Sequence, residues 1–173
     1  YSAPAILTDI RKNLLNGITW PKMHLFPTKD RPIFSLRSIR KSLLLGSLSV
    51  QAIPAPHSHT ALSFIISEKN KSIVISGDMA PTRALWDEVN RLKHLKAIFL
   101  ELSFPGALAD LAWQTRHLST LSLIRELAKI KNKKIPIYLY HLKPVYFQKI
   151  KSEIKKLQIK QLHILTPKTT LIF

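Results

Sequence analysis

The chain has 173 residues, of which 46% are apolar and 21% charged, and this balance excludes an intrinsically disordered chain. The absence of Cys excludes disulfides and thiolate metal sites, so any metal must be bound by His and carboxylate side chains. The formal net charge of +17 fits a phosphate-bearing partner such as a nucleotide or nucleic acid, the alternative being dispersed surface lysines without a binding role. No apolar run approaches the roughly 18 residues of a membrane helix, so we expect no membrane partner. The chain starts at Tyr1 without a signal-peptide pattern, which predicts a processed or truncated start and, by default, a cytoplasmic location.

The elements predicted in chain order form a layered α/β fold. They are a helix over 4–16, an irregular Pro-containing segment over 18–35, two short strands around Gly46 within 42–55, a hairpin of strands over 62–66 and 72–76, a helix over 81–92, a strand over 95–100, a helix over 119–131, a strand over 135–140, a helix over 145–157 and a final strand pair over 161–165 and 169–173. Ser119 is the predicted N-cap of its helix, which should point Leu121, Ile124, Leu127 and Ala128 inward.

Polar residues with metal-binding chemistry lie at or just beyond the ends of the predicted buried strands: His59, Asp78, Glu101 and His141. In sheet proteins, side chains at such positions converge on one crevice. Gly77 allows a sharp turn that aims the Asp78 carboxylate, which suits a hard metal or a bridge between two metals. His141 in YLYHLKP is either a metal ligand or a packed His bonded to a carbonyl group.

Two further His positions have more than one interpretation. His117 by itself is typical of a helix start without a chemical role, but Glu101 could orient it as a general acid. His57 and His59 form an H-S-H pair, so both could reach one metal from a strand, whereas only one could from a loop. Trp20, Trp86 and Trp113 are interpreted as packing residues. The chain has no G-x-S-x-G motif, P-loop or G-x-G-x-x-G motif, which excludes the chemistries that depend on them.

Six stretches in this order resemble the metallo-β-lactamase superfamily, and within it the bacterial class II cyclic-nucleotide phosphodiesterases, with ribonuclease Z a less close match. The stretches are LLNGITWP (14–21), PHSHTALSFII (56–66), SGDMAPTRALW (76–86), IFLELSFP (98–105), RHLST (116–120) and PIYLYHLKP (136–144). The resemblance implies an αββα sandwich that is incomplete at its N-terminus, with residues 1–173 forming the C-terminal two-thirds of one domain.

The resemblance also implies roles for individual residues. His59 would bind the first of two divalent metal ions, with Zn favoured, Asp78 would bridge both, and His141 would bind the second. His117, held by Glu101, would protonate the leaving oxygen. His59 is preferred to His57 because Thr60 follows it, as in the family pattern. Lys143 and His57 are weaker candidates for contacts with the substrate phosphate.

The implied activity is hydrolysis of 3′,5′-cyclic nucleotides, cyclic AMP in particular, to nucleoside 5′-monophosphates by an activated water. The family's leading H-x-H-x-D-H signature does not occur in this sequence, so we expect this chain to be an incomplete or inactive fragment of the enzyme. The alternatives are a ribonuclease Z-like tRNA 3′-processing endonuclease, which would make nucleic acid the partner, and a degenerate remnant without activity. The choice between cyclic AMP and cyclic GMP stays open, as does the oligomeric state, a homodimer included.

Overall fold

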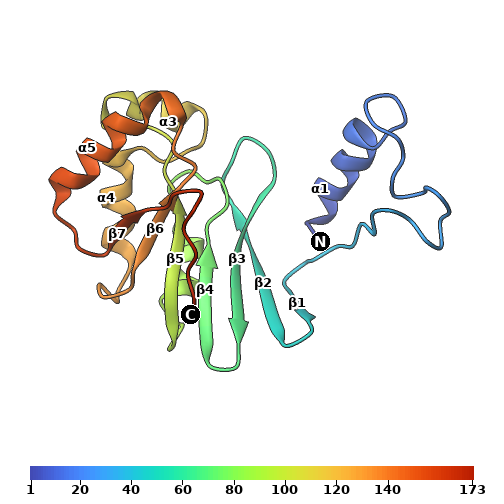
Figure 1. Cartoon of the computed structure of the whole chain (residues 1–173), viewed down its shortest axis with the longest axis horizontal. Helices are drawn as coiled ribbons and strands as arrows, with labels where there is room; N and C mark the ends of the chain where they lie inside the picture. Colours follow the sequence, from blue (N-terminus) through green and yellow to red (C-terminus); the bar gives the residue numbers. More distant parts are fainter. The chain divides into compact units, whose positions relative to one another are not determined.

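A computed structural model describes residues 1–173, which divide into two compact units, Tyr1–Ser42 and Leu43–Phe173 (Figure 1). The helices are α1 (Pro4–Asp9), α2 (Ala84–Val89), α3 (Ala109–Gln114), α4 (Thr120–Lys129) and α5 (Phe147–Leu157). The strands are β1 (Ser42–Leu45), β2 (Leu48–Ala55), β3 (Ala61–Glu68), β4 (Lys71–Ile75), β5 (Leu95–Glu101), β6 (Ile137–Tyr140) and β7 (Leu162–Ile164). A π-helical turn spans Ile10–Leu14, and 3₁₀ turns span Gly106–Leu108 and Pro144–Tyr146.

The first unit is one short helical segment followed by irregular chain. Pro4 occupies the first position of α1, where its missing N–H leaves no helical hydrogen bond unmade. The π-helical turn continues α1 directly, so the predicted helix over 4–16 is confirmed. No helix or strand lies within residues 18–35, as its three prolines predicted.

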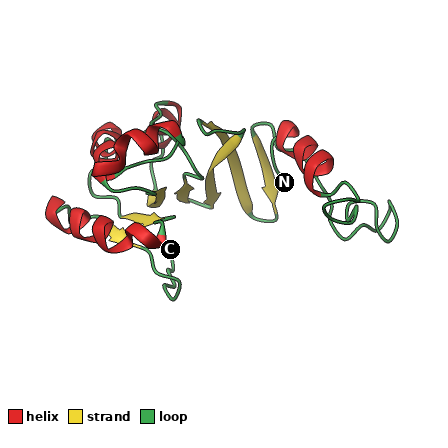
Figure 2. Cartoon of the chain, turned by 90° about the horizontal axis from the view of Figure 1, so that it is seen from above, coloured by secondary structure: helices red, strands yellow, loops and turns green.

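The second unit is built on a seven-stranded sheet with the strands in sequence order. Strands β2, β3 and β4 are antiparallel, whereas β4, β5, β6 and β7 are parallel. Because parallel strands run in one direction, the carboxyl ends of β4, β5 and β6 meet at one edge, which the loop between β2 and β3 also joins. In Figure 2 the helices of this unit lie outside the sheet, and no helix is inserted between neighbouring strands.

The end of the chain differs from the predicted strand pair. β7 pairs in parallel with β6, but residues 169–173 form no strand, so this part of the prediction is wrong. The chain turns after β7, where the Thr169 N–H donates to the Thr166 carbonyl oxygen at 2.9 Å. The Phe173 ring then packs edge-on to Phe99, with 6.1 Å between centroids, so the last residues cover the sheet instead of extending it.

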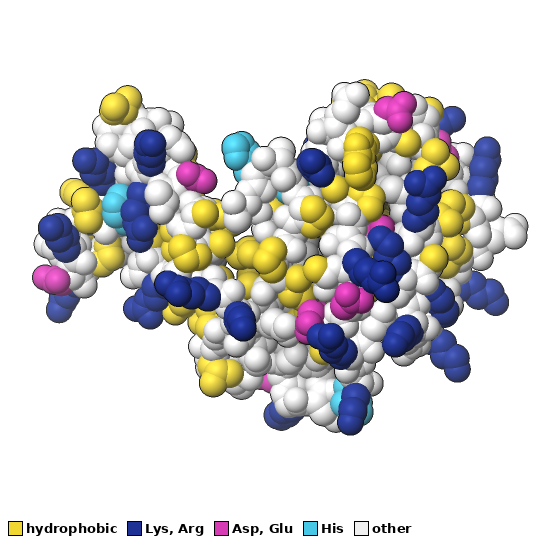
Figure 3. All heavy atoms as spheres, turned by 180° about the vertical axis from the view of Figure 1, so that it is seen from behind, with side chains coloured by type: hydrophobic (Ala, Val, Ile, Leu, Met, Phe, Trp, Pro, Cys, Tyr) yellow, Lys and Arg dark blue, Asp and Glu magenta, His cyan; other side chains and the backbone are white.

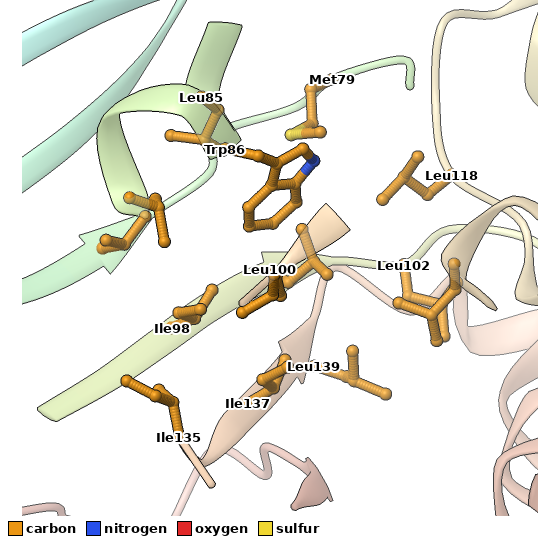
Figure 4. Packing of buried hydrophobic residues seen from close by; sticks show 14 of the residues in the cluster. Met79, Leu85, Trp86, Ile98, Leu100, Leu102, Leu118, Ile135, Ile137 and Leu139 are labelled. Atoms are coloured by element: carbon orange, nitrogen blue, oxygen red, sulfur yellow. The ribbon is translucent and has the colours of Figure 1, made fainter. Parts of the chain in front are cut away.

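The hydrophobic core lies between one face of the sheet and the helices. Figure 4 shows Trp86 and Met79 next to Ile98 and Leu100 of β5. Trp86 is 1% exposed, and α5 adds Ile150 and Ile154 to the same cluster. The side of α2 that carries Leu85, Trp86 and Val89 is therefore buried in the core.

Helix α4 turns to the core a face that matches the predicted one only in part: Leu127 packs against the core cluster, whereas Ala128 is exposed. Its Ser119 N-cap forms a capping box with Ser122, as expected, but Leu121 and Ile124 are 54% and 45% exposed. Glu126 is 0% exposed instead. Its carboxylate accepts hydrogen bonds from Trp86 Nε1 (2.6 Å) and the Thr82 N–H (3.1 Å) and pairs with Lys129. These partners compensate for burial of the charge and fix the rotation of α4 about its axis.

The same contacts shorten the predicted helix over 81–92 to α2. The N–H of Thr82 is bonded to Glu126, and its carbonyl oxygen accepts from Lys129 Nζ at 2.7 Å. Thr82 is therefore held by α4 rather than by helical hydrogen bonds. α3, a short helix with a single buried residue, Ala112, lies in a stretch for which no element was predicted.

Candidate metal centre

A glycine turn brings Asp78 to the edge where the parallel strands end. Gly77 has a φ of +61°, and a Cβ at this position would lie 2.4 Å from the Leu62 carbonyl oxygen of β3. No side chain fits that space, so only glycine allows the chain to pass β3 at this distance. The turn places the half-exposed Asp78 carboxylate in contact with His141.

Ser76 joins the ends of β4 and β5. Its hydroxyl donates to the Gly77 carbonyl oxygen at 2.7 Å and accepts from the Glu101 N–H at 3.0 Å. The Tyr140 hydroxyl at the end of β6 lies 3.4 Å from the Ser76 hydroxyl oxygen, and burial raises the pKa of the Tyr140 phenol. One buried serine therefore contacts the ends of three neighbouring strands.

Glu101 is fully buried, and its carboxylate accepts three hydrogen bonds through Oε1. The donors are the N–H groups of Leu118 (2.9 Å) and Met79 (3.3 Å) and the His117 ring nitrogen Nδ1 (3.2 Å). Because Nδ1–H of His117 is bound in this way, the neutral ring has an unprotonated Nε2. A carboxylate that fixes the tautomer and orientation of a His is the arrangement expected of a general acid and its supporting group.

Ser103 lies at the centre of the polar cluster. Its hydroxyl donates to Glu101 Oε2 at 3.1 Å and lies 3.3 Å from the Nδ1 atoms of both His117 and His141. Ser103 was not among the predicted site residues. The spacing of Glu101 and Ser103, two residues apart at the end of a strand, is the signal that could have identified it, since such residues share a face.

His141 has strained backbone geometry at the end of β6, with a φ of +64°. Its Nδ1 lies 3.1 Å from Asp78 Oδ1 and next to Ser103. A histidine whose Nδ1 is held by a carboxylate or a hydroxyl group can offer Nε2 to a metal ion, in a defined orientation.

The structure brings His57, rather than His59, to the cluster. Both lie in the loop between β2 and β3, but His59 is exposed and belongs to neither group of potential ligands. His57 Nε2 lies 3.5 Å from His117 Nε2. Burial lowers the pKa of His57, and the neighbouring His117 lowers it further. A lowered pKa favours the neutral imidazole, which is the metal-binding form. The choice of His59 over His57 thus remains a prediction, which this geometry does not favour.

Two groups of three potential ligands lie at this edge, each with its donor atoms within 4.8 Å of one another: His57, Asp78 and His117, and Glu101, His117 and His141. Imidazole nitrogen and carboxylate oxygen are the donors that zinc takes from proteins without cysteine. The donor set therefore fits a divalent metal ion. Lys143, the proposed phosphate contact, belongs to neither group, and its Nζ lies 5.9 Å from the Phe104 ring centroid.

The chain carries 27 Lys and Arg residues against 10 Asp and Glu residues. Figure 3 shows Lys and Arg side chains dispersed over the face drawn, with few acidic side chains among them. None of the helices has the length and apolar character needed to cross a bilayer.

Solved structures with the same fold are metallo-β-lactamase fold proteins. Zn²⁺-bound PqqB from Methylobacterium extorquens matches 100% of this chain and 64% of its own, with a TM-score of 0.68 and 13% identity. The metallo-β-lactamase fold protein YhfI from Bacillus subtilis matches 75% of this chain and 52% of its own (TM-score 0.62, 13% identity). The short form of human tRNase Z matches 72% of this chain and 44% of its own (TM-score 0.53, 17% identity).

These likenesses confirm the predicted α/β metallo-β-lactamase-like fold. The chain spans between about half and two-thirds of the length of the first two structures. No family model matches the sequence, and no curated protein matches it.

Proposed function

We propose that this chain carries part of the active site of a metal-dependent phosphodiester hydrolase. The observation that carries the proposal is the buried Glu101–His117 pair, with 3.2 Å between Oε1 and Nδ1, next to His57, Asp78 and His141. A general acid and a set of metal ligands are the two components that hydrolysis of a phosphodiester requires at its departing and attacking sides.

Each residue has a distinct role in this proposal. His57 and Asp78 from one group of potential ligands, and His141 from the other, would hold divalent metal, Zn being favoured, and Asp78 Oδ1 lies 3.1 Å from His141 Nδ1. When bound, the metal supplies Lewis-acid stabilisation of phosphoryl oxygens and lowers the pKa of a bound water. His117, when both of its ring nitrogens are protonated, would donate the Nε2 proton to the departing oxygen, while Glu101 accepts from Nδ1–H and stabilises the protonated ring.

The proposed substrate is a 3′,5′-cyclic nucleotide, with cyclic AMP the first to test and a nucleoside 5′-monophosphate as product. This choice rests on the six stretches that resemble class II cyclic-nucleotide phosphodiesterases. Processing of tRNA 3′ ends is the second candidate, favoured by the likeness to human tRNase Z and by the net charge of +17, since RNA binding gains from basic residues.

A complete two-metal centre needs more ligands than these residues offer. The sequence contains no H-x-H-x-D-H motif, so the remaining donors of the proposed centre would come from outside this chain. The proposal therefore separates metal binding, which this chain should show weakly by itself, from turnover, which should require the added donors. In this proposal residues 1–173 are a portion of one catalytic domain.

The test is Zn²⁺ binding by the 173-residue chain, measured by calorimetry and elemental analysis, beside cyclic AMP hydrolysis. Asp78→Ala should weaken Zn²⁺ binding at least tenfold, because it removes a charged donor. Asp87→Ala is the matched control, since Asp87 is an exposed carboxylate of α2. Equal Zn²⁺ affinity in the Asp78→Ala and Asp87→Ala variants would sink the proposed metal site.

A further inference from the structure

We propose that the cavity between α3 and α4 binds the base of a mononucleotide. It has a volume of about 450 Å³, within the range of small-ligand pockets. Its lining includes His117 together with Trp113 and Asp110 of α3 and Arg125, Glu126 and Lys129 of α4. The inference rests on the proposed function for its choice of ligand, and it adds the part of the molecule that recognises that ligand.

The position of His117 connects this cavity to the candidate metal centre. His117 belongs to both groups of potential metal ligands and also lies in the wall of the cavity. A group that accepts a proton from His117 must lie against this ring, so the nucleoside attached to the departing oxygen has the cavity as its neighbouring space. The phosphate would then lie towards Asp78 and His141, and the base towards α3 and α4.

Trp113 provides the stacking surface. Its side chain belongs to α3, it is 61% exposed, and the Arg116 guanidinium lies 5.7 Å from its ring centroid. Trp86 lies in the core cluster, whereas Trp113 lies outside it. An exposed indole in a cavity wall offers a flat apolar face, which stacks on a nucleobase regardless of its identity.

The charged residues of the cavity fall into two kinds. Glu126 and Lys129 pair with each other and with the backbone of Thr82, so they form a fixed part of the wall. Arg125 and Asp110 are exposed, and neither takes part in the ion pairs of the chain. Arg125 offers hydrogen-bond donors and Asp110 offers acceptors, which is the combination that the polar edge of a base requires.

The experiment measures the contribution of the base to binding. Calorimetry with chelator present, so that metal plays no part, compares 5′-AMP and 5′-GMP with ribose 5-phosphate, which has the sugar and phosphate but no base. We expect at least one nucleotide to bind tenfold or more tightly than ribose 5-phosphate. Trp113→Ala should remove most of this advantage, and Trp113→Phe should retain it, because a phenyl ring still stacks.

Matched variants separate the cavity from the rest of the surface. Trp20→Ala removes a similarly exposed indole in the first unit, and Arg91→Ala removes an exposed guanidinium from outside the cavity. Both should bind nucleotide as the unchanged chain does, whereas Arg125→Ala should weaken nucleotide binding several-fold. Cooperative urea unfolding followed by far-UV circular dichroism verifies that each variant is folded.

Three results would overturn the inference: no advantage of either nucleotide over ribose 5-phosphate, an advantage that survives Trp113→Ala, or single-stranded RNA binding more than tenfold more tightly than both mononucleotides. The last result would assign the surface to RNA. None of these three binding measurements requires bound metal. If nucleotides bind more tightly than ribose 5-phosphate but Asp78→Ala leaves Zn²⁺ affinity unchanged, the base-binding cavity stands and the proposed metal-dependent hydrolase is rejected. If Asp78→Ala weakens Zn²⁺ binding but nucleotides have no advantage, the hydrolase stands and the base-binding cavity is rejected.

Discussion

Two adjacent rows of side chains cross the same sheet, and their burial differs. The core row, on the face covered by helices, is Ile65, Val74, Ile98 and Ile137. The open row, on the opposite face, is Phe64, Ile75, Phe99, Tyr138 and His163. Every side chain of the core row is at most 5% exposed, whereas the open row is half-buried and ends in the exposed His163.

The difference shows that burial here is set by what covers each face and not by the polarity of the strands. The open row consists largely of apolar and aromatic side chains, and Phe99 stacks on Tyr138 with 5.5 Å between ring centroids. Phe173 covers part of it by packing against both rings. The core row is covered by α2, α4 and α5 and should therefore contribute most of the stability of this unit.

Truncation of one isoleucine from each row gives the largest expected effect. Ile98→Ala should lower the free energy of unfolding by about 2–5 kcal/mol, because it leaves a cavity in a packed core. Ile75→Ala deletes the same atoms from the half-buried open row and should cost about 1 kcal/mol, since less apolar area is withdrawn from water. Urea denaturation of both variants measures the difference. Equal losses would show that the two rows are equally packed.

Removal of the buried carboxylate tests the helix that covers the core row. Glu126→Ala leaves Trp86 Nε1 and the Thr82 N–H without their acceptor, which should cost roughly 1–3 kcal/mol of unfolding free energy. Asp87→Ala, which breaks the exposed pair with Arg83, should cost well under about 1 kcal/mol. If the two variants lose the same stability, Glu126 does not fix the orientation of α4.

Ser103→Ala tests the link between the packed face and the polar edge, with the smallest expected effect on stability, about 1 kcal/mol. The substitution removes the hydroxyl group that contacts Glu101, His117 and His141. Because these contacts orient the candidate ligands, Zn²⁺ affinity should fall roughly tenfold. Ser72→Ala, which removes a hydroxyl pair with Ser67 at the opposite end of β4, is the control. Unchanged Zn²⁺ affinity in Ser103→Ala would contradict an orienting role.

The order of strands and helices could be predicted because each element carries its own local signal. The Ser119 cap and the short turn between β3 and β4 are encoded within a few residues of sequence. The inward face of α4 could be predicted only in part from hydrophobic spacing. Glu126 is buried only because Trp86 and Thr82, some forty residues earlier, supply hydrogen bonds to it.

The candidate site likewise combines features that the local sequence predicts with features that depend on the fold. The ends of the parallel strands predicted that Asp78, Glu101 and His141 would meet, and the structure brings them together. The choice between His57 and His59 depends on the path of a loop, which residue spacing does not determine. The spacing of Ser103 from Glu101 is visible in the sequence, but its contacts with His117 and His141 depend on the fold and could not be predicted.

The close approach at Gly77 has a consequence for how this sequence can vary. With the Leu62 carbonyl oxygen only 2.4 Å from where a Cβ would lie, every other amino acid must move the backbone of β3 or of the turn. In a saturation library selected only for folded protein, position 77 should therefore return glycine almost alone, while the half-exposed Asp78 beside it should accept many residues. Selection for metal binding should also require a carboxylate at position 78. Comparison of the two selections would then show that position 77 is constrained by folding and position 78 by metal binding.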